Sequence, residues 1–288
     1  MRTESEMLDL ILRVAKEDER VRAVGMNGSR INPNAPVDPF QDFDIVYLVN
    51  HMQSFIEDPE WVDVFGDRLI MQTPEAMALF PSELGERFSY LMLFTDGNRL
   101  DLILAPIQEK DMYEKEDSLT ILLLDKDDLL PETSAPTDQD YWVSEPTGIL
   151  FDNCCNEFWW VSTYVAKGLW RKEILYALDH INLVRNMLIK MLEWRVGFET
   201  DYSVSIGKNA KYLEQFVDKQ TWLTLLSTYP PGEYEAIWGS LFKLCELFIE
   251  TATYVANSLH FDYPYSTERN VMQYLRHIKD LPSDATVI

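Results

Sequence analysis

The feature that most constrains the fold is a change of hydrophobic periodicity at the middle of the chain. Between residues 21 and 124, apolar side chains gather in short β-rich runs separated by turn residues, a pattern typical of the strands of a sheet. Beyond residue 147 these runs vanish, and apolar side chains recur every three or four positions, as on one face of a helix. We therefore expect an α+β protein in which a sheet domain precedes a domain of helices.

The N-terminal part is expected to form one mixed sheet with helices. An amphipathic helix over residues 3–17 precedes the strands, and shorter helical stretches fall near residues 51–57 and 74–79. The turn residues Asp96-Gly97-Asn98 lie between two adjacent runs and predict a hairpin, because they tolerate positive φ. The predicted strands are 21–27, 43–49, 68–72, 88–95, 99–106 and 119–124. We place this domain at residues 1–135.

The C-terminal part is expected to be a helix bundle. Residues 131–147, PETSAPTDQDYWVSEPT, have the composition of a linker, and we place the helical domain at residues 148–288. Seven of the eight tryptophans lie from this linker onward, where they form either core or a surface that stacks on a ligand. The three cysteines lack the spacing of a disulfide framework or a zinc site, which favours buried packing residues. The predicted helices are 150–170, 173–196, 208–227, 232–259 and 267–280.

The charge of the chain excludes several classes of partner. Lysine and arginine number 25 against 48 aspartates and glutamates, a net charge of −23 that repels nucleic-acid phosphates and anionic lipids. The same field attracts a polycationic small molecule or a basic partner. No segment is apolar enough to be a signal peptide or a membrane span, so we expect a soluble cytoplasmic protein, with a monomer favoured.

Two acidic residues at the start of the second predicted strand carry the first sign of chemistry. Successive strand residues point to opposite faces, so Asp42 and Asp44 project together while Phe43 faces the other way. Two carboxylates held so close repel each other unless a cation neutralises them, and Mg²⁺ prefers oxygen ligands of this kind. A single Asp-x-Asp in an acidic chain is also common as a solvated turn, so the motif needs support from elsewhere in the sequence.

That support comes from Asp101 and from the turn at Gly28-Ser29-Arg30. Asp101 lies among aliphatic residues of a predicted strand, where a buried carboxylate requires a metal or another partner. Gly28 allows the backbone to approach a phosphate, and Ser29 offers a hydroxyl and an N–H group to it. The chain has no Walker A motif, so this turn is not a P-loop.

The pattern of Gly-Ser, Asp-x-Asp and a later aspartate resembles the nucleotidyltransferase superfamily, whose catalytic domain is a DNA polymerase β-like palm. Four stretches, at residues 27–49, 94–106, 150–171 and 205–213, are similar to the aminoglycoside 6-adenylyltransferases, which inactivate streptomycin. The resemblance runs over nearly the whole chain and implies a nucleotidyltransferase domain followed by a helical bundle. It also implies transfer of AMP from ATP to the 6-hydroxyl of streptomycin, release of pyrophosphate, and two Mg²⁺ ions.

In this resemblance Asp42, Asp44 and Asp101 are the catalytic residues and metal ligands. Asp101 would share one ion and lie near the acceptor hydroxyl, either as general base or as the ligand that lowers the pKa of that hydroxyl. The nucleotide would lie at Gly28, Ser29 and Arg30, with ATP as co-substrate.

The helical half is expected to add Arg185 and Lys208 to the nucleotide site. Arg185 lies in the inward stripe of the helix 173–196, so it faces either an interdomain cleft or the edge of the core. Residues 207–212 are expected to open the next helix, where the helix dipole and lysine charges suit a triphosphate or simply face solvent. The resemblance favours Lys208 over Lys211 for the phosphates.

The polycationic drug requires acids beside aromatic walls, because streptomycin carries two guanidinium groups and a secondary amine. Asp152, Glu157 and Asp179 are the acids nearest the aromatic helices, and each is either a drug-binding residue or a structural acid.

Two other functions stay open at the level of sequence. A nucleotidyltransferase with another acceptor, such as a second aminocyclitol, a protein side chain or RNA, has the same motifs, although the net charge disfavours RNA. A catalytically silent binding module has no need for three mutually repelling carboxylates, so their presence argues against it.

Overall fold

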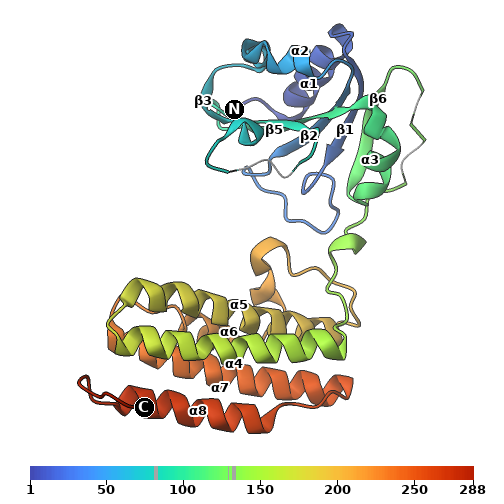
Figure 1. The fold of residues 1–288 in the computed structure, drawn as a ribbon. Helices are drawn as coiled ribbons and strands as arrows, with labels where there is room; N and C mark the ends of the chain where they lie inside the picture. The colour runs from blue at the N-terminus through green and yellow to red at the C-terminus, as the bar shows by residue number, and fades with distance from the viewer. Residues whose placement is uncertain (81–83, 129, 132–133) are drawn as a thin grey trace. The chain divides into compact units, whose positions relative to one another are not determined.

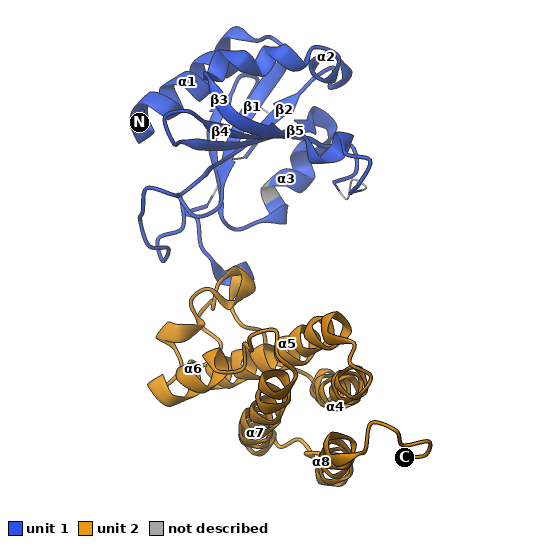
Figure 2. Cartoon of the chain, turned by 90° about the vertical axis from the view of Figure 1, so that its left-hand side faces the viewer, with its two compact units in different colours: residues 1–140 blue, residues 141–288 orange. Residues whose placement is uncertain are grey.

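A computed structural model describes residues 1–80, 84–128, 130–131 and 134–288 (Figure 1). The chain divides into two compact units, residues 1–140 and 141–288, which we call unit 1 and unit 2 (Figure 2). Their boundary lies inside the segment 131–147. Each unit has its own hydrophobic core, and the α+β class expected from the sequence is confirmed.

Unit 1 is built on a six-stranded mixed sheet with the strand order β3-β4-β5-β2-β1-β6. The strands are β1 (Val21–Asn27), β2 (Phe43–Val49), β3 (Arg68–Gln72), β4 (Phe88–Phe94), β5 (Arg99–Pro106) and β6 (Thr120–Asp125). The central strands β2 and β5 are parallel, whereas the other neighbours are antiparallel. Because β2 and β5 run side by side in the same direction, both of them begin at the same edge of the sheet.

Helices cover both faces of this sheet. The helix α1 (Glu4–Glu17) begins with a capping box between Thr3 and Glu6, and its buried residues join the larger core of the unit. The short helix α2 (Gln53–Ile56) and the 3₁₀ segment Pro59–Phe65 add side chains to that same core. The helix α3 (Lys110–Glu116) contributes Tyr113 to a smaller cluster on the other face.

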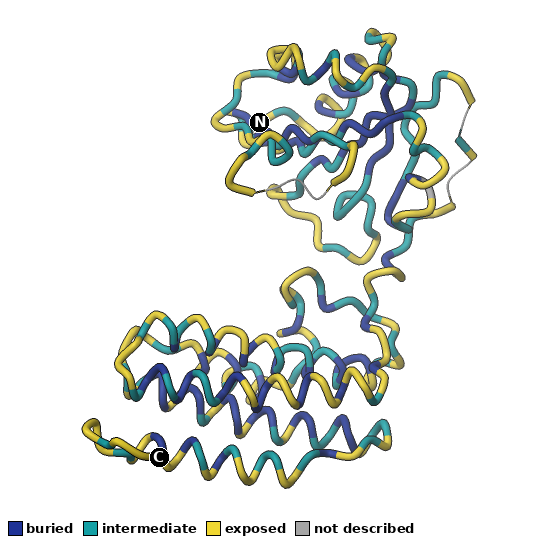
Figure 3. The backbone as a smooth tube through the Cα atoms, viewed as in Figure 1, coloured by how far each residue is buried: buried dark blue, intermediate teal, exposed yellow. Residues whose placement is uncertain are grey.

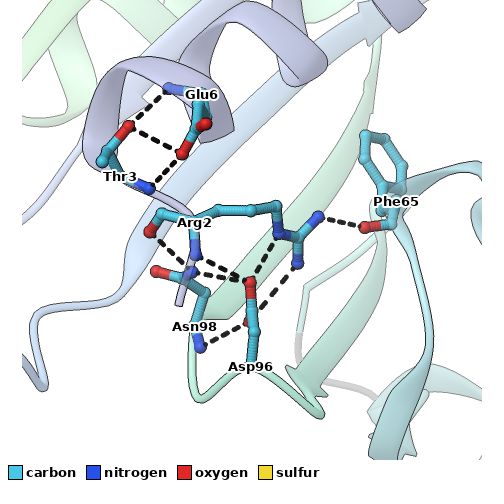
Figure 4. Close-up of polar contacts among 6 residues, drawn as sticks. All are labelled: Arg2, Thr3, Glu6, Phe65, Asp96 and Asn98. Atoms are coloured by element: carbon cyan, nitrogen blue, oxygen red, sulfur yellow. Dashed lines mark hydrogen bonds and ion pairs between the residues drawn. The ribbon is translucent and has the colours of Figure 1, made fainter.

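The hairpin between β4 and β5 is clamped to the N-terminus of the chain (Figure 4). The Arg2 guanidinium donates to Asp96 at 2.6 Å and to the carbonyl of Phe65 at 2.5 Å. The Asn98 side chain donates to the Arg2 carbonyl at 3.1 Å, and Gly97 adopts a φ of +87°. The pKa of Asp96 is held well below its usual range by the Arg2 hydrogen bond. The predicted hairpin is therefore confirmed, and its turn fixes the start of β5.

Unit 2 is a bundle of helices whose buried side chains line the interior (Figure 3). Its helices are α4 (Gly148–Trp170), α5 (Ile174–Glu199), α6 (Lys219–Leu226), α7 (Tyr234–Leu259) and α8 (Tyr265–Asp280). The free thiols of Cys154, Cys155 and Cys245 are all buried, as the sequence predicts. Most of the tryptophans pack in or against this core, whereas Trp160 on α4 is 58% exposed.

The helix predicted over residues 208–227 is confirmed only in its second part, and the prediction for its first part is wrong. The chain forms two single 3₁₀ turns, Lys208–Ala210 and Leu213–Gln215, and the regular helix α6 begins only at Lys219. Gly207, Asn209 and Ala210 have positive φ, which breaks a right-handed helix, and Asp218 caps the start of α6. The stretch 74–79 likewise contains only a 3₁₀ turn, Pro74–Ala76.

None of the helices in the described part of the chain is both long and apolar enough to cross a membrane.

Candidate active site

Three carboxylates gather where β2 and β5 begin. Asp44 lies in register with Asp101 of the parallel neighbour β5 and with Asn27 of the antiparallel neighbour β1. Phe43 is fully buried in the core, so the alternation of the strand directs Asp44 to the other face, as expected. Asp42 directly precedes the strand. The fold thus brings together three acids that are up to 59 residues apart in the sequence.

The three charges disturb one another. The pKa of Asp44 is raised to about 6, first by burial and then by the negative charges of Asp101 and Asp42. Burial also raises the pKa of Asp42, with Arg99 acting in the opposite direction and Asp101 adding to the rise. A carboxylate cluster of this kind needs positive charge in order to stay ionised.

Arg99 supplies such a charge, and sequence reasoning missed it. Its Nε and Nη2 donate to the two carboxylate oxygens of Asp101 at 2.8 and 2.7 Å, and its Nε lies 3.6 Å from an oxygen of Asp42. The pKa of Arg99 is raised by the hydrogen bond to Asp101, against a lowering by burial. The signal was present in the sequence, because residues 99 and 101 of a strand point to the same face.

The absence of a side chain at Gly28 leaves space for the carboxylate of Asp44. Gly28 follows β1 with a φ of +80°, and a Cβ atom at this position would lie 2.1 Å from an Asp44 carboxylate oxygen. Only glycine accepts both the left-handed backbone and this close approach. The preceding Asn27 is held in place by donation to Thr120 at 2.6 Å and by acceptance from Tyr113 at 2.8 Å.

Arg30 ties together the two ends of the loop between β1 and β2. Its guanidinium donates to the carbonyls of Asp42 at 3.0 Å and Gln41 at 2.7 Å, and it stacks on the Phe43 ring at 3.7 Å. Gln41 in turn donates to the carbonyl of Ser29 at 3.0 Å. Arg30 is therefore engaged with the protein backbone, and its contact with a nucleotide stays a prediction.

The chemistry of this cluster suits Mg²⁺, although the side chains are turned toward Arg99. Within the described ranges, no group of three or more His, Cys, Asp or Glu side chains is arranged to hold a metal ion as it stands. The donor set nevertheless consists of carboxylate oxygens on adjacent strands, and their repulsion raises the pKa of Asp44, which is the condition that a divalent cation relieves. The chemistry of Asp42, Asp44 and Asp101 therefore fits a magnesium ion.

Unit 2 contains a pocket of about 730 Å³ with Lys208 in its wall. Gly207, Asn209 and Asn186 are also in the wall, as is Lys190, which forms an ion pair at 2.7 Å with Glu193. Among the residues that the structure describes, no ion pair engages Lys208. Lys208 opens a 3₁₀ turn, so the helix dipole expected beside it is absent, and the remaining donors are its ammonium group and neighbouring polar groups.

Arg185 lies beside this pocket and is not among its lining residues. It is only 2% exposed, and it donates to the hydroxyl and carbonyl of Thr228 at 3.0 and 2.5 Å and to Asn182 at 2.6 Å. It also stacks on Tyr229 at 3.8 Å, and Tyr229 does line the pocket. Burial lowers the pKa of Arg185. The contacts assign Arg185 to the support of Tyr229, and direct contact with a nucleotide stays a prediction.

The three acids considered for the drug are all exposed. Asp152 and Glu157 lie on α4 and Asp179 lies on α5. Glu157 is one helical turn from the exposed Trp160, whose indole donates to the Tyr164 hydroxyl at 2.7 Å. Asp179 adjoins His180, which packs edge-on against Tyr164 across the two helices. Acids and exposed aromatic side chains therefore share the surface of α4 and α5.

The chain is similar to known proteins over most of its length. The family model described as streptomycin adenylyltransferase matches residues 1–278. The chain is 47% identical to an aminoglycoside 6-adenylyltransferase of Bacillus subtilis (strain 168), over 92% of this chain and 94% of the relative. It is also 47% identical to one of Campylobacter jejuni, over 93% of both chains, and 38% identical to one of Staphylococcus aureus, over 96% of this chain and 99% of the relative.

A solved structure, the crystal structure of an aminoglycoside 6-adenyltransferase from Bacillus subtilis, is 41% identical and covers 98% of this chain and 100% of its own, with a TM-score of 0.49. The family model and the curated relatives each extend over more than nine-tenths of the chain and take in both units. The family expected from the sequence is confirmed: the chain belongs to the streptomycin adenylyltransferase family of enzymes.

Proposed function

We propose that this enzyme transfers AMP from ATP to the 6-hydroxyl of streptomycin and releases pyrophosphate, in the cytoplasm and as a monomer. The observation that carries the proposal is the cluster of Asp42, Asp44 and Asp101 beside the Gly28-Ser29 turn, in a chain that belongs to this family. The cluster offers negative oxygen ligands for metal, and the turn offers backbone groups to a phosphate.

Magnesium, when bound, would supply positive charge to the phosphate oxygens in an in-line displacement, and two ions of it would be held by the three aspartates. The residues of the chain have their own tasks in this proposal. Gly28 and Ser29 would receive the phosphates, and Lys208 is proposed as a further phosphate contact. Asp101 would act beside the acceptor hydroxyl as general base or as metal ligand.

The polycationic drug would be recognised by acids that lie beside aromatic rings. Glu157 is exposed one helical turn from Trp160, and the exposed Asp179 adjoins His180, whose ring packs against Tyr164. A guanidinium group gains from both neighbours, because it pairs with carboxylates and stacks on aromatic faces. Asp152 lies about two helical turns before Trp160 on the same helix and is the third candidate.

The test is incubation of the enzyme with Mg²⁺, labelled ATP and a panel of aminoglycosides, followed by mass analysis of the drugs. We expect one adenylyl group to be added to streptomycin, and pyrophosphate to accumulate in equal amount. Magnetic resonance of the product would locate the group on the 6-hydroxyl. Modification of another acceptor only, such as a protein, would contradict the proposal.

Lys208→Ala is expected to weaken ATP binding by about 1 to 3 kcal/mol, because one charge-assisted phosphate contact is lost. Calorimetric titration with a non-hydrolysable ATP analogue measures this change. Lys211→Ala is the matched control, because Lys211 is exposed three residues away and packs over Tyr212. Unchanged ATP affinity in both Lys208→Ala and an Arg185→Ala variant would confine the nucleotide to unit 1.

Streptomycin binding is expected to weaken as KCl is added, because salt shortens the reach of charge to about 8 Å at physiological ionic strength. Asp179→Asn and Glu157→Gln should each weaken drug binding and flatten this salt dependence. The affinity for ATP should stay nearly unchanged, since an anionic nucleotide gains nothing from these acids. Titrations of the drug at low and high KCl measure both effects, and drug binding that does not respond to salt would speak against an acidic drug site.

A further inference from the structure

Arg99 is the cation most directly engaged with the catalytic carboxylates. It contacts both oxygens of Asp101 and approaches Asp42 to 3.6 Å, and the side chain of Asp101 is only 18% exposed. Paired donation from a guanidinium group to a carboxylate is the strongest geometry available to such a pair. Both oxygens of Asp101 are therefore committed to Arg99.

Arg30, the other arginine near the cluster, has different partners. Arg30 donates to two backbone carbonyls and lies on the Phe43 ring, so its guanidinium is fixed in the loop. Its side chain is 11% exposed, against 45% for Arg99. Arg99 is thus held only by carboxylates in the described contacts, and its exposed side chain has room to swing away from them.

A carboxylate oxygen that accepts from a guanidinium cannot at the same time give the same lone pairs to a metal ion. The positive guanidinium also repels a cation that approaches the same carboxylates, so the closed pair of Arg99 and Asp101 and the metal-bound cluster disfavour each other. We call the state in which Arg99 has left Asp101 the open state. For a cation that binds only this state, the apparent association constant is the intrinsic one multiplied by the fraction of molecules that are open. The pair consequently sets how much divalent cation is needed to load the site.

We propose that Arg99 is a built-in counter-ion that neutralises Asp101 and Asp42 in the metal-free enzyme and competes with divalent cations for them. This inference rests on the proposed function, because it takes these aspartates to be the metal ligands. It assigns to Arg99 a positioning role in the metal-free state and makes its release from Asp101 a condition of metal binding.

The test is the binding of Mn²⁺ to the full-length enzyme without nucleotide. Calorimetry and the electron paramagnetic resonance signal of free Mn²⁺ both measure this binding. Arg99→Gln keeps a side chain of moderate length and removes the competing charge. If the pair is closed about nine-tenths of the time, the variant binds Mn²⁺ about tenfold more tightly than wild type. Arg22→Gln is the matched control, since Arg22 pairs with Asp127 away from the cluster, and it should leave Mn²⁺ affinity unchanged.

A double-mutant cycle separates direct competition from a general change of field. In an Asp101→Asn background Arg99 loses its bidentate partner and keeps only the approach to Asp42, so Arg99→Gln should tighten Mn²⁺ binding clearly less than it does with Asp101 present. Measurement in about 0.5 M KCl screens the long-range field and should leave the tenfold effect of the single variant largely intact. Melting curves add an independent readout: the metal-free variant should melt below wild type, and saturating Mn²⁺ should close that gap.

Mn²⁺ affinity that is unchanged or weaker in Arg99→Gln would overturn the inference. An equal effect of Arg99→Gln in the Asp101→Asn background would overturn it too. If either of these results is found while wild type binds Mn²⁺ and adenylylates streptomycin, the inference about Arg99 is wrong and the proposed function stands. If wild type binds no Mn²⁺ at all, the proposed two-metal function fails with it.

Discussion

Asp44→Asn is expected to lower turnover by on the order of 10³-fold while unit 1 stays folded. Asp44 is more deeply buried than Asp42, and its pKa is raised to about 6 by burial and by the charges of Asp101 and Asp42. An asparagine has the same size but no charge, so it removes the charge of a proposed metal ligand without leaving a cavity. Turnover of streptomycin at saturating Mg²⁺ and the melting temperature measure the two properties separately.

The raised pKa of Asp44 predicts whether Asp44→Asn raises or lowers the free energy of unfolding. A carboxyl with a pKa of about 6 in the folded chain and 3.8 in the unfolded chain binds its proton more tightly when folded. The free energy of unfolding therefore falls as the pH rises between these two values, and the full penalty, at most about 3 kcal/mol, is present above pH 6. Asp44→Asn removes the penalty, so its melting temperature should exceed that of wild type at pH 8 and differ less at pH 5.

The control for this experiment is Asp63→Asn, because Asp63 is an exposed acid of unit 1 that pairs with Arg68 outside the cluster. This variant should keep wild-type turnover. Near wild-type turnover of Asp44→Asn at saturating Mg²⁺ would show that Asp44 is no metal ligand. Asp42→Asn should also lose turnover, but its effect on stability should be smaller, because Asp42 is less buried than Asp44.

The sequence predicted the strands, and the common direction of Asp42 and Asp44, because both depend on local rules. Alternation in a strand places Asp42 and Asp44 on one face and Phe43 in the core, and the turn residues 96–98 predict the hairpin that carries Asp101. What joins Asp44 to Asp101 is the parallel pairing of β2 with β5, and no local signal states which strands become neighbours. The GS…DxD…D resemblance supplied that information.

The predictions that failed or stayed open depend on tertiary contacts. The helix expected at 208–227 is interrupted because Asn209 and Ala210 adopt left-handed backbone angles, although neither residue type requires them. Arg185 lies on the inward stripe, as expected, but its partners include Thr228 and Tyr229 from the turn after α6, which periodicity cannot reveal. Arg99 was visible as a cation two residues before Asp101, yet only the structure shows the paired hydrogen bonds.

Gly28→Ala is expected to reduce turnover by on the order of 10²-fold and to destabilise unit 1 by about 1 to 3 kcal/mol. Two effects add at this position. The left-handed backbone at a φ of +80° is strained for alanine, and the new methyl group collides with the Asp44 carboxylate, which must move. Moving one ligand of the cluster by about 1 Å is enough to disturb a pre-arranged catalytic geometry.

Gly85→Ala separates these two effects, because Gly85 also has a positive φ, +66°, but a Cβ atom there would meet nothing within 4 Å. It should lose stability through strain alone and keep its turnover. The double variant Gly28→Ala with Asp44→Gly offers a second comparison: the collision is removed, so the melting temperature should recover part of its loss while turnover stays low. If Gly28→Ala keeps full turnover and loses only the stability that Gly85→Ala loses, then the close approach of Asp44 to the backbone has no catalytic importance, and the phosphate-binding role of this turn must be carried by Ser29 alone.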